Sequence, residues 1–189
     1  LEAFSEVREG NGVAEAAAYE GHGPHPIVLL NSSGKKHQWT DKVPMDWRPI
    51  NVTDVELVTF VGEEKSEVIN VCHYWTGPDI KLIAFYMYVE LREAQTGEII
   101  ARTKLSGPGP GVCLQFEAER TTAIYGSSVE FGTLRTWLEP YVAGDACLPT
   151  QMQKVVADEE ILRISPLWHS ESESLIDIVL LTSFYNTYD

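Results

Sequence analysis

The chain has 189 residues, of which 44% are hydrophobic, and its 28 acidic and 14 basic residues give a net charge of -14 at pH 7. These values are typical of a globular chain that is long enough to bury a core, and they exclude a wholly disordered chain. The charge repels nucleic acid and anionic membrane surfaces, and no apolar run has the length of a membrane-spanning helix, so we expect neither nucleic-acid binding nor membrane insertion.

The acidic excess lies at the two ends of the chain. Residues 1–24 have a net charge of -4 and residues 143–189 one of -6, whereas residues 25–142 hold fifteen acidic and eleven basic side chains. This division predicts an acidic N-terminal arm or linker, a β-rich domain over 25–142 and an acidic, apolar C-terminal segment. A short helix is expected at Leu1–Glu9, but its apolar face is weak, which favours a linker or docking arm over a part of the core.

The β-rich domain begins with a short strand and a long loop. Ile27–Leu30 is a short apolar run that ends at a turn-forming sequence, and residues 35–49 show no period. Trp39 and Trp47 lie in this loop. We expect them to plug one end of the sheet, although loop tryptophans, Trp75 included, could instead face a ligand or a carbohydrate ring.

The strongest strand signal of the chain is Ile80–Arg92, where the odd positions form an unbroken apolar face and the even positions change from apolar to charged. Gly62–Lys65 and Gln95–Gly97 have the composition of hairpin turns. These features predict a mainly β fold, an antiparallel meander that forms a small β-sandwich or a curled sheet. The other strands expected in the meander are Val55–Val61, Ser66–Trp75, Ile99–Leu105 and Val112–Phe116.

One helix is expected to pack on this sheet. A helix over residues 128–139 has an apolar stripe, and Ser127 or Ser128 stands where a helix cap is expected, with Glu130 three residues after Ser127 as in a capping box. Pro140 should end or kink this helix.

The C-terminal segment contains an apolar run that is either a helix or a strand. The run is apolar nearly all round, so it is either buried or built to meet a partner, and we expect a protein partner or self-association. The candidate partner-binding residues are Leu175, Ile176, Val179, Leu180, Phe184 and Tyr185.

The three cysteines, Cys72, Cys113 and Cys147, lack the close spacing of a thiolate zinc site, and no other metal or cofactor motif is present. Cys72 and Cys113 both lie on predicted strands that could be neighbours, so a disulfide and a pair of buried free thiols are both open. The compartment, cytoplasmic or extracellular, depends on which of the two is correct.

A cysteine- or histidine-dependent enzyme is the least favoured class. Cys72 and His73 are adjacent in sequence, but neighbouring side chains on a strand point to opposite faces, so they cannot act together unless the strand bulges. The chain also lacks a Gly-x-Ser-x-Gly nucleophile turn, a dinucleotide fingerprint and a His-Glu-x-x-His helix.

Several short motifs, taken in order, resemble a known family. They are Val55–Val61, Cys72-His-Tyr74, Glu93-Ala-Gln-Thr-Gly97, Gly107 with Cys113, Gly126-Ser-Ser-Val129 and Trp137-Leu-Glu-Pro-Tyr-Val142. Over residues 25–142 the chain is similar to an uncharacterised β-rich accessory module of large bacterial signalling proteins that carry repeat, kinase or caspase-like parts. The resemblance implies an accessory or interaction role without catalytic residues, and in many members of the family the cysteines are paired.

These observations favour a non-enzymatic protein-interaction module within a larger or oligomeric assembly. The alternative is an extracellular domain that binds a small ligand or a glycan through Trp39, Trp47 or Trp75.

Overall fold

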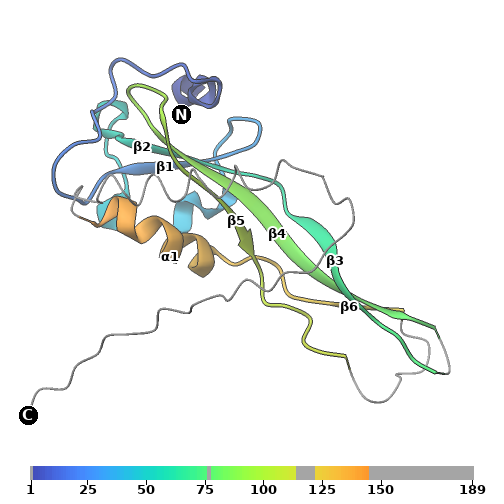
Figure 1. Ribbon diagram of the computed structural model, residues 1–189. Helices are drawn as coiled ribbons and strands as arrows, with labels where there is room; N and C mark the ends of the chain where they lie inside the picture. The colour runs from blue at the N-terminus through green and yellow to red at the C-terminus, as the bar shows by residue number, and fades with distance from the viewer. Residues whose placement is uncertain (1, 76–77, 114–121, 145–189) are drawn as a thin grey trace, which may run out of the picture.

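The computed structural model describes residues 2–75, 78–113 and 122–144, which form a mainly β fold (Figure 1). The elements in chain order are the 3-10 helix η1 (Glu2–Glu9), the strand β1 (Ile27–Asn31), the 3-10 helices η2 (Gln38–Lys42), η3 (Met45–Trp47) and η4 (Val52–Asp54), the strands β2 (Leu57–Val61), β3 (Lys65–Cys72), β4 (Ile80–Glu93), β5 (Ile99–Ser106) and β6 (Ala123–Tyr125), and the helix α1 (Phe131–Val142).

The long strand β4 is the centre of a single open sheet. β2 pairs antiparallel with its C-terminal part and β3 with its N-terminal part, while β5 and β6 lie along the opposite edge. The mainly β fold with a packed helix is confirmed, and it is an open, curled sheet rather than a sandwich. The sheet is mixed, because β1 runs parallel to β2 and β6 runs parallel to β4.

The hairpin predicted at Gly62–Lys65 is wrong. β2 and β3 run in the same direction along β4, and residues 62–64 bulge because they stand opposite only two residues of β4. The Gly62 N–H donates to the Tyr88 carbonyl at 2.8 Å, and a Cβ on Gly62 would lie 2.9 Å from the same oxygen. The bulge therefore requires glycine, and a sequence that is typical of a turn serves a continuous strand pair instead.

Both faces of the sheet are covered around β1, β2, β5 and residues 87–93 of β4, a part that we call the body. On one face, α1 and the two buried tryptophans of the η2–η3 segment pack against the odd positions of β4. On the other face, the N-terminal segment packs against β1 and β2. The core residues of the first face include Leu29, Trp39, Trp47, Leu57, Val89, Leu91, Leu134 and Leu138, and those of the second include Phe4, Val7, Val28, Leu30, Val58 and Phe60.

The N-terminal segment, which we expected to be an arm or linker outside the core, contributes to the core instead. Phe4 and Val7 of η1 are fully buried. Side chains three residues apart align on a 3-10 helix, so two apolar residues suffice to cover the sheet even though the nine-residue run has a weak apolar face. The backbone of Gly12 lies against Gln95, where a Cβ would come within 1.9 Å of the Gln95 carbonyl oxygen.

The packed helix is α1, and it starts three residues later than predicted. Glu130 is the N-cap residue and makes no side-chain cap hydrogen bond, so the predicted capping box is wrong. The carboxylate of Glu64, from the β2–β3 bulge, accepts from the Val129 N–H at 2.8 Å and from the Ser128 hydroxyl at 3.0 Å. Pro140 does not end the helix, which continues to Val142.

The rest of the sheet extends away from the body, as Figure 1 shows at its lower right. We call this part the arm: β3, residues 80–86 of β4, residues 107–113 and β6. The buried positions of β4 change here to Ile80, Leu82 and Ala84, which face the side opposite α1. The predicted change along the even positions of β4 is therefore present, with apolar residues in the arm and charged residues in the body.

Candidate functional site

The three tryptophans singled out from the sequence lie in three different environments. Trp47 is 4% exposed and belongs to the core, so it plugs the sheet as expected. Trp39 is 7% exposed and packs edge-on against Phe131, with ring centroids 6.0 Å apart, but it also lines a surface cleft. Trp75 is fully exposed at the end of the arm. The three residues therefore do not form one site.

Cys72 and Cys113 form a disulfide, with Cα atoms 5.6 Å apart. The bond joins the end of β3 to the loop that follows β5, and Cys72 is buried beside Ile80 and Leu82. A bonded sulfur offers no thiolate nucleophile. His73, the residue next to Cys72 in sequence, forms an exposed pair with Asp79 at 3.0 Å. The candidate partner-binding residues after Gly144, from Leu175 to Tyr185, lie outside the described residues.

The arm exposes apolar side chains on both of its faces. Val68 and Ile69 of β3 are each 50% exposed. Phe85 stacks on the exposed Tyr125, with ring centroids 6.2 Å apart. Within the described residues β3 pairs only with β4, so its other edge carries no strand. The arm thus combines an open strand edge with apolar side chains next to it.

The sheet face opposite α1 carries a ladder of charged and aromatic side chains where the arm meets the body. The Lys104 ammonium lies 4.1 Å above the centroid of Tyr86 and contacts Glu67 at 2.6 Å. The hydrogen bond that Lys104 donates to Glu67 raises the pKa of Lys104 above its ordinary value. The carboxylate of Glu90 pairs with Arg92 and, at 2.5 Å, with Arg102. These groups are paired with each other, so the ladder is a structural feature of the sheet surface.

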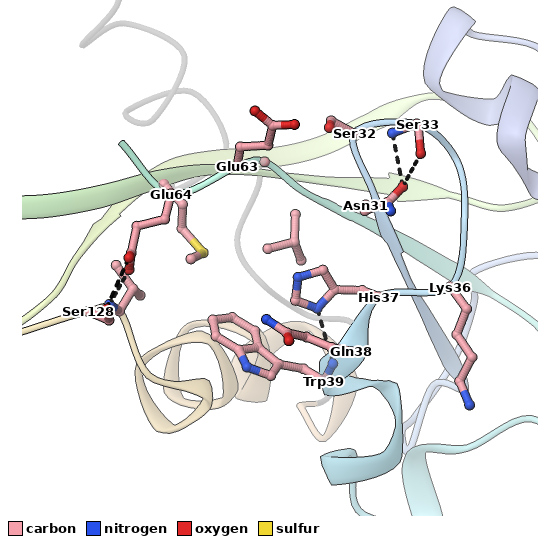
Figure 2. A pocket seen from close by; sticks show the side chains of 14 residues that line it. Asn31, Ser32, Ser33, Lys36, His37, Gln38, Trp39, Glu63, Glu64 and Ser128 are labelled. Carbon is pink, nitrogen blue, oxygen red and sulfur yellow. Dashed lines mark hydrogen bonds between the residues drawn. The ribbon is translucent and has the colours of Figure 1, made fainter. Parts of the chain in front are cut away.

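A cleft of about 650 Å³ lies between three segments that are distant in sequence (Figure 2). Its walls are the β1–η2 loop, the β2–β3 bulge and the residues just before α1, and its volume falls in the range of about 300–1,000 Å³ that is typical of small-ligand sites. The lining residues are Asn31, Ser32, Ser33, Lys36, His37, Gln38, Trp39, Val61, Gly62, Glu63, Glu64, Met87, Ser128 and Val129.

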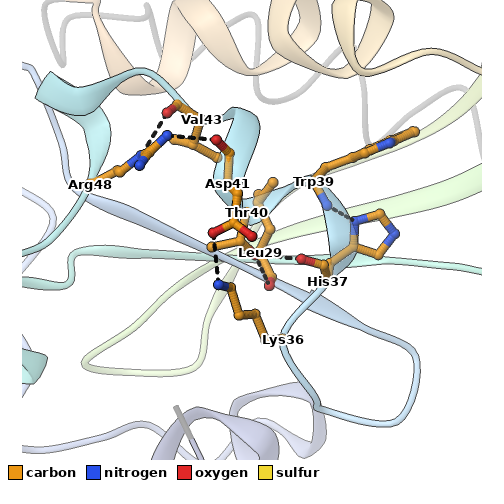
Figure 3. Close-up of polar contacts among 8 residues, drawn as sticks. All are labelled: Leu29, Lys36, His37, Trp39, Thr40, Asp41, Val43 and Arg48. Carbon is orange, nitrogen blue, oxygen red and sulfur yellow. Dashed lines mark hydrogen bonds and ion pairs between the residues drawn. The ribbon is translucent and has the colours of Figure 1, made fainter.

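A network of polar contacts holds the β1–η2 wall of the cleft in place (Figure 3). The Thr40 hydroxyl is 3.2 Å from the Leu29 carbonyl oxygen and 2.7 Å from that of His37, which fixes η2 to β1. The Arg48 guanidinium donates to the carbonyl oxygens of Val43 and Asp41. Lys36 pairs with the Asp41 carboxylate at 2.8 Å, and this hydrogen bond lowers the pKa of Asp41.

His37 is the half-buried titratable group of the cleft, and burial lowers the pKa of its imidazole. Its Nδ1 accepts from the Trp39 backbone N–H at 3.2 Å, so that His37 caps η2. An accepting Nδ1 places the proton of the neutral ring on Nε2. Figure 2 shows this second nitrogen directed away from Trp39 and toward the interior of the cleft. His37 is therefore a neutral residue that offers one N–H donor.

Carboxylates form the opposite wall of the cleft. Glu64 is held by Ser128 and Val129, as described for the start of α1. Glu63 is exposed, and its carboxylate makes no hydrogen bond or ion pair with any described residue. The cleft thus has a ring N–H donor on one side and fixed and free acceptors on the other, and Met87 and Trp39 also line it.

Two buried polar atoms in the described part of the chain have no hydrogen-bond partner, His25 Nε2 and Thr59 Oγ1. The other ring nitrogen of His25 contacts the Glu56 carboxylate at 2.5 Å, and Tyr19 packs edge-on against the ring. Burial, followed by the charge of Glu56, raises the pKa of Tyr19. Neither orphaned atom lines the cleft, so we do not assign them to it.

Comparisons with protein-family models, curated proteins and solved structures find no match for this chain. Across the described ranges, no three His, Cys, Asp or Glu side chains gather closely enough to hold a metal ion. In the same ranges no helix combines the length and apolarity needed to cross a bilayer.

Sequence reasoning identified Trp39 but missed His37, Glu63 and Glu64. The two glutamates were assigned to a hairpin turn, which would have placed them at a loop tip rather than in a cleft wall. The cleft exists only because β2 continues into β3 along β4, and no local pattern in the sequence signals this continuation.

Proposed function

We propose that this protein is a non-enzymatic interaction module whose arm binds an extended segment of a partner protein. The outer edge of β3 is the observation that carries the proposal. β3 has eight residues, and within the described chain it has a strand neighbour on one side only. Such an edge presents a row of backbone donors and acceptors to which an extended peptide can add as a new strand.

The side chains next to this edge supply contacts of a second kind. Val68 and Ile69 are half exposed, and an apolar surface of this kind gains free energy when a partner covers it. The pairing of β3 with β4 shifts at Ile69, which is an extra residue in the ladder. A bulge interrupts a regular strand edge, so the expected docking stretch is Lys65–Val68.

The resemblance to an accessory module of bacterial signalling proteins supports the same class of function. The apolar residues from Leu175 to Tyr185 extend the proposal to a second contact with the partner or with another copy of the chain. A chain truncated after Gly144 retains every described residue, so we expect it to keep its sheet and lose partner binding or self-association. Unfolding of the truncated chain, measured by circular dichroism, would contradict this extension.

A peptide library displayed on phage tests the arm. We expect the selected peptides to shift the backbone amide NMR signals of Lys65–Val68. We also expect their affinity to fall at least tenfold in the Val68→Lys variant, which corresponds to a loss of binding free energy on the order of 1.4 kcal/mol. Ile50→Lys is the matched control, because Ile50 is 91% exposed but lies outside the arm. Peptides that bind Val68→Lys and Ile50→Lys equally well, or a selection that yields no arm-dependent peptide, would refute the proposal.

A second candidate function is small-ligand binding in the cleft, which Trp39 favours. Trp47 is buried in the core and Trp75 lies at the end of the arm, whereas Trp39 lines the cleft. Of the three tryptophans predicted to contact a ligand or a glycan, Trp39 is therefore the one that we retain. A disulfide between Cys72 and Cys113 is typical of an oxidising compartment, which supports an extracellular location for either function.

A further inference from the structure

We propose that the cleft between Trp39 and Glu63 binds a neutral saccharide of one or two sugar rings. The inference rests on the second candidate function and names its ligand class. It is independent of the arm, because the residues that line the cleft do not include any residue of β3, β6 or the loop 107–113.

The cleft is lined by both apolar and polar side chains. Trp39, Val61, Met87 and Val129 contribute apolar atoms to the lining, each with at most 7% of its surface exposed, and the other lining residues are mainly polar. A pyranose ring carries C–H groups on its faces and hydroxyl groups at its edge. A lining of mainly polar groups with a few apolar atoms among them therefore suits such a ligand better than it suits a wholly apolar one.

The β1–η2 wall supplies hydrogen-bond donors that are already oriented. The Nδ1 of His37 is occupied by the Trp39 N–H at 3.2 Å, so the ring is fixed and its Nε2–H is directed into the cleft (Figure 2). Because burial lowers the pKa of His37, the ring is neutral at pH 7. Gln38, beside it in the same wall, adds an amide that both donates and accepts.

The opposite wall supplies acceptors for hydroxyl protons. The Glu63 carboxylate has no partner among the described residues, and each oxygen of Glu64 retains a lone pair beyond its contact with Ser128 or Val129. A ligand that spans the cleft must therefore accept from His37 and donate to Glu63. A sugar hydroxyl does both.

The charges of the cleft select against ionic ligands. Lys36 is the only lysine or arginine in the lining, and it is paired with Asp41 at 2.8 Å, whereas Glu63 and Glu64 are both negative. An anionic ligand would meet two carboxylates without a free cation. A cationic group would satisfy Glu63 but cannot accept from the His37 N–H, so a cationic ligand needs a separate acceptor for that wall. A neutral ligand with hydroxyl groups satisfies both walls.

The experiment uses the full chain and a panel of glucose, galactose, mannose, lactose and maltose, with glucuronate and choline as the anionic and cationic probes. Saturation-transfer NMR detects binding, and the Trp39 indole N–H signal places it in the cleft. We expect at least one neutral sugar to bind with a Kd on the order of 1 mM, as for a small polar ligand in an open site. We expect glucuronate and choline to bind at least tenfold more weakly.

Two variants and one control connect binding to the cleft. Glu63→Gln removes the free carboxylate without breaking any contact between described residues, and we expect it to weaken binding about tenfold, the effect of one charge-assisted hydrogen bond. His37→Asn removes the ring donor but keeps a side-chain oxygen that can cap the Trp39 N–H, and a similar loss is expected. Glu139→Gln, an exposed carboxylate on α1 outside the cleft, is the matched control and should leave binding unchanged.

Three outcomes would overturn the inference. These are no binding of any neutral sugar, tighter binding of glucuronate or choline than of every neutral sugar, and neutral-sugar binding that Glu63→Gln and His37→Asn leave unchanged. Tighter binding of choline or glucuronate than of every neutral sugar, detected at the Trp39 signal, would refute a neutral saccharide but keep a ligand site in the cleft. Absence of all shifts at Trp39 would refute the second candidate function itself.

Discussion

The body and the arm share the strand β4 but are stabilised in different ways. In the body, both faces of the sheet are covered, by α1 and the tryptophan loop on one side and by the N-terminal segment on the other. In the arm, the small cluster around Cys72, Ile80 and Leu82 is the one hydrophobic cluster formed by described residues, and a disulfide lies next to it. The body is held by burial, whereas the arm depends on a covalent link and on pairing with β4.

This difference shows how one strand can serve two environments. The buried side of β4 changes between Ala84 and Met87, because the layer that covers the sheet changes sides at this point. The β2–β3 bulge lies opposite the same part of β4. Because a shift of one residue in register turns side chains to the other face, the bulge allows the paired strand to follow this change. The cleft lies beside the bulge, where the body ends.

The largest effect is expected from a substitution in the body. Phe4→Ala removes a fully buried ring from the cluster that covers β1 and β2, and a Phe→Ala change in a core costs about 3–5 kcal/mol of unfolding free energy. Urea denaturation measures the change. Ile69→Ala in the arm is the control, and because Ile69 is half exposed we expect a cost of less than about 1 kcal/mol. Equal costs for the two variants would show that the N-terminal segment is not part of the core.

A smaller and more local effect is expected from loss of the disulfide. Cys72 and Cys113 are 41 residues apart, for which the chain-entropy relation gives a stabilisation of at most roughly 4 kcal/mol. We expect Cys113→Ser to accelerate amide hydrogen exchange in β3 and β6 while β1 and β2 stay protected, because the body retains both of its covering layers. Cys147→Ser is the matched control, since the described disulfide does not use Cys147. Uniform loss of protection would show that the body and the arm unfold as one unit.

The elements that sequence reasoning located correctly are those whose signal is local. Alternation over Ile80–Arg92 identified β4, and the Gln95–Gly97 turn identified the β4–β5 hairpin, where Gly97 has a φ of 76°. Gly62–Lys65 has an equally typical turn composition. Whether such a sequence reverses the chain or bulges depends on the length of the strand opposite it, which is not a local property.

The cap of α1 and the cleft depend on the same long-range pairing. Ser127 and Glu130 have the spacing of a capping box, but Glu64 supplies the contact from 64 residues away in sequence at the Ser128 hydroxyl and 65 at the Val129 N–H. No spacing rule relates Glu64 to this helix. Trp39 could be identified from the sequence because a tryptophan in a loop is a candidate ligand contact by residue type alone. His37 differs, because its role depends on the half-buried position that the bulge and the loop create together.

The smallest predicted effect is a pH dependence at the boundary between the body and the arm. Burial lowers the pKa of His37 below its unfolded value of 6.5. At pH values below about 6.5 the unfolded chain therefore binds a proton at His37 more readily than the folded chain does. As a result, the free energy of unfolding decreases as the pH falls below about 6.5, and it is fully present above that pH. Protonation also removes the Nδ1 acceptor that caps the Trp39 N–H.

The loss should be well below the roughly 1.4 kcal/mol that one full pKa unit represents, because the ring is only half buried and solvent screens it. Urea midpoints of the native chain and of His37→Asn, compared at pH 7.5 and pH 5.5, isolate this contribution from that of the other titrating groups. We expect the native chain to lose more stability than the variant between the two pH values. An identical loss in both would mean that His37 titrates as in the unfolded chain, and the neutral donor inferred for the cleft wall would then lose its physical basis.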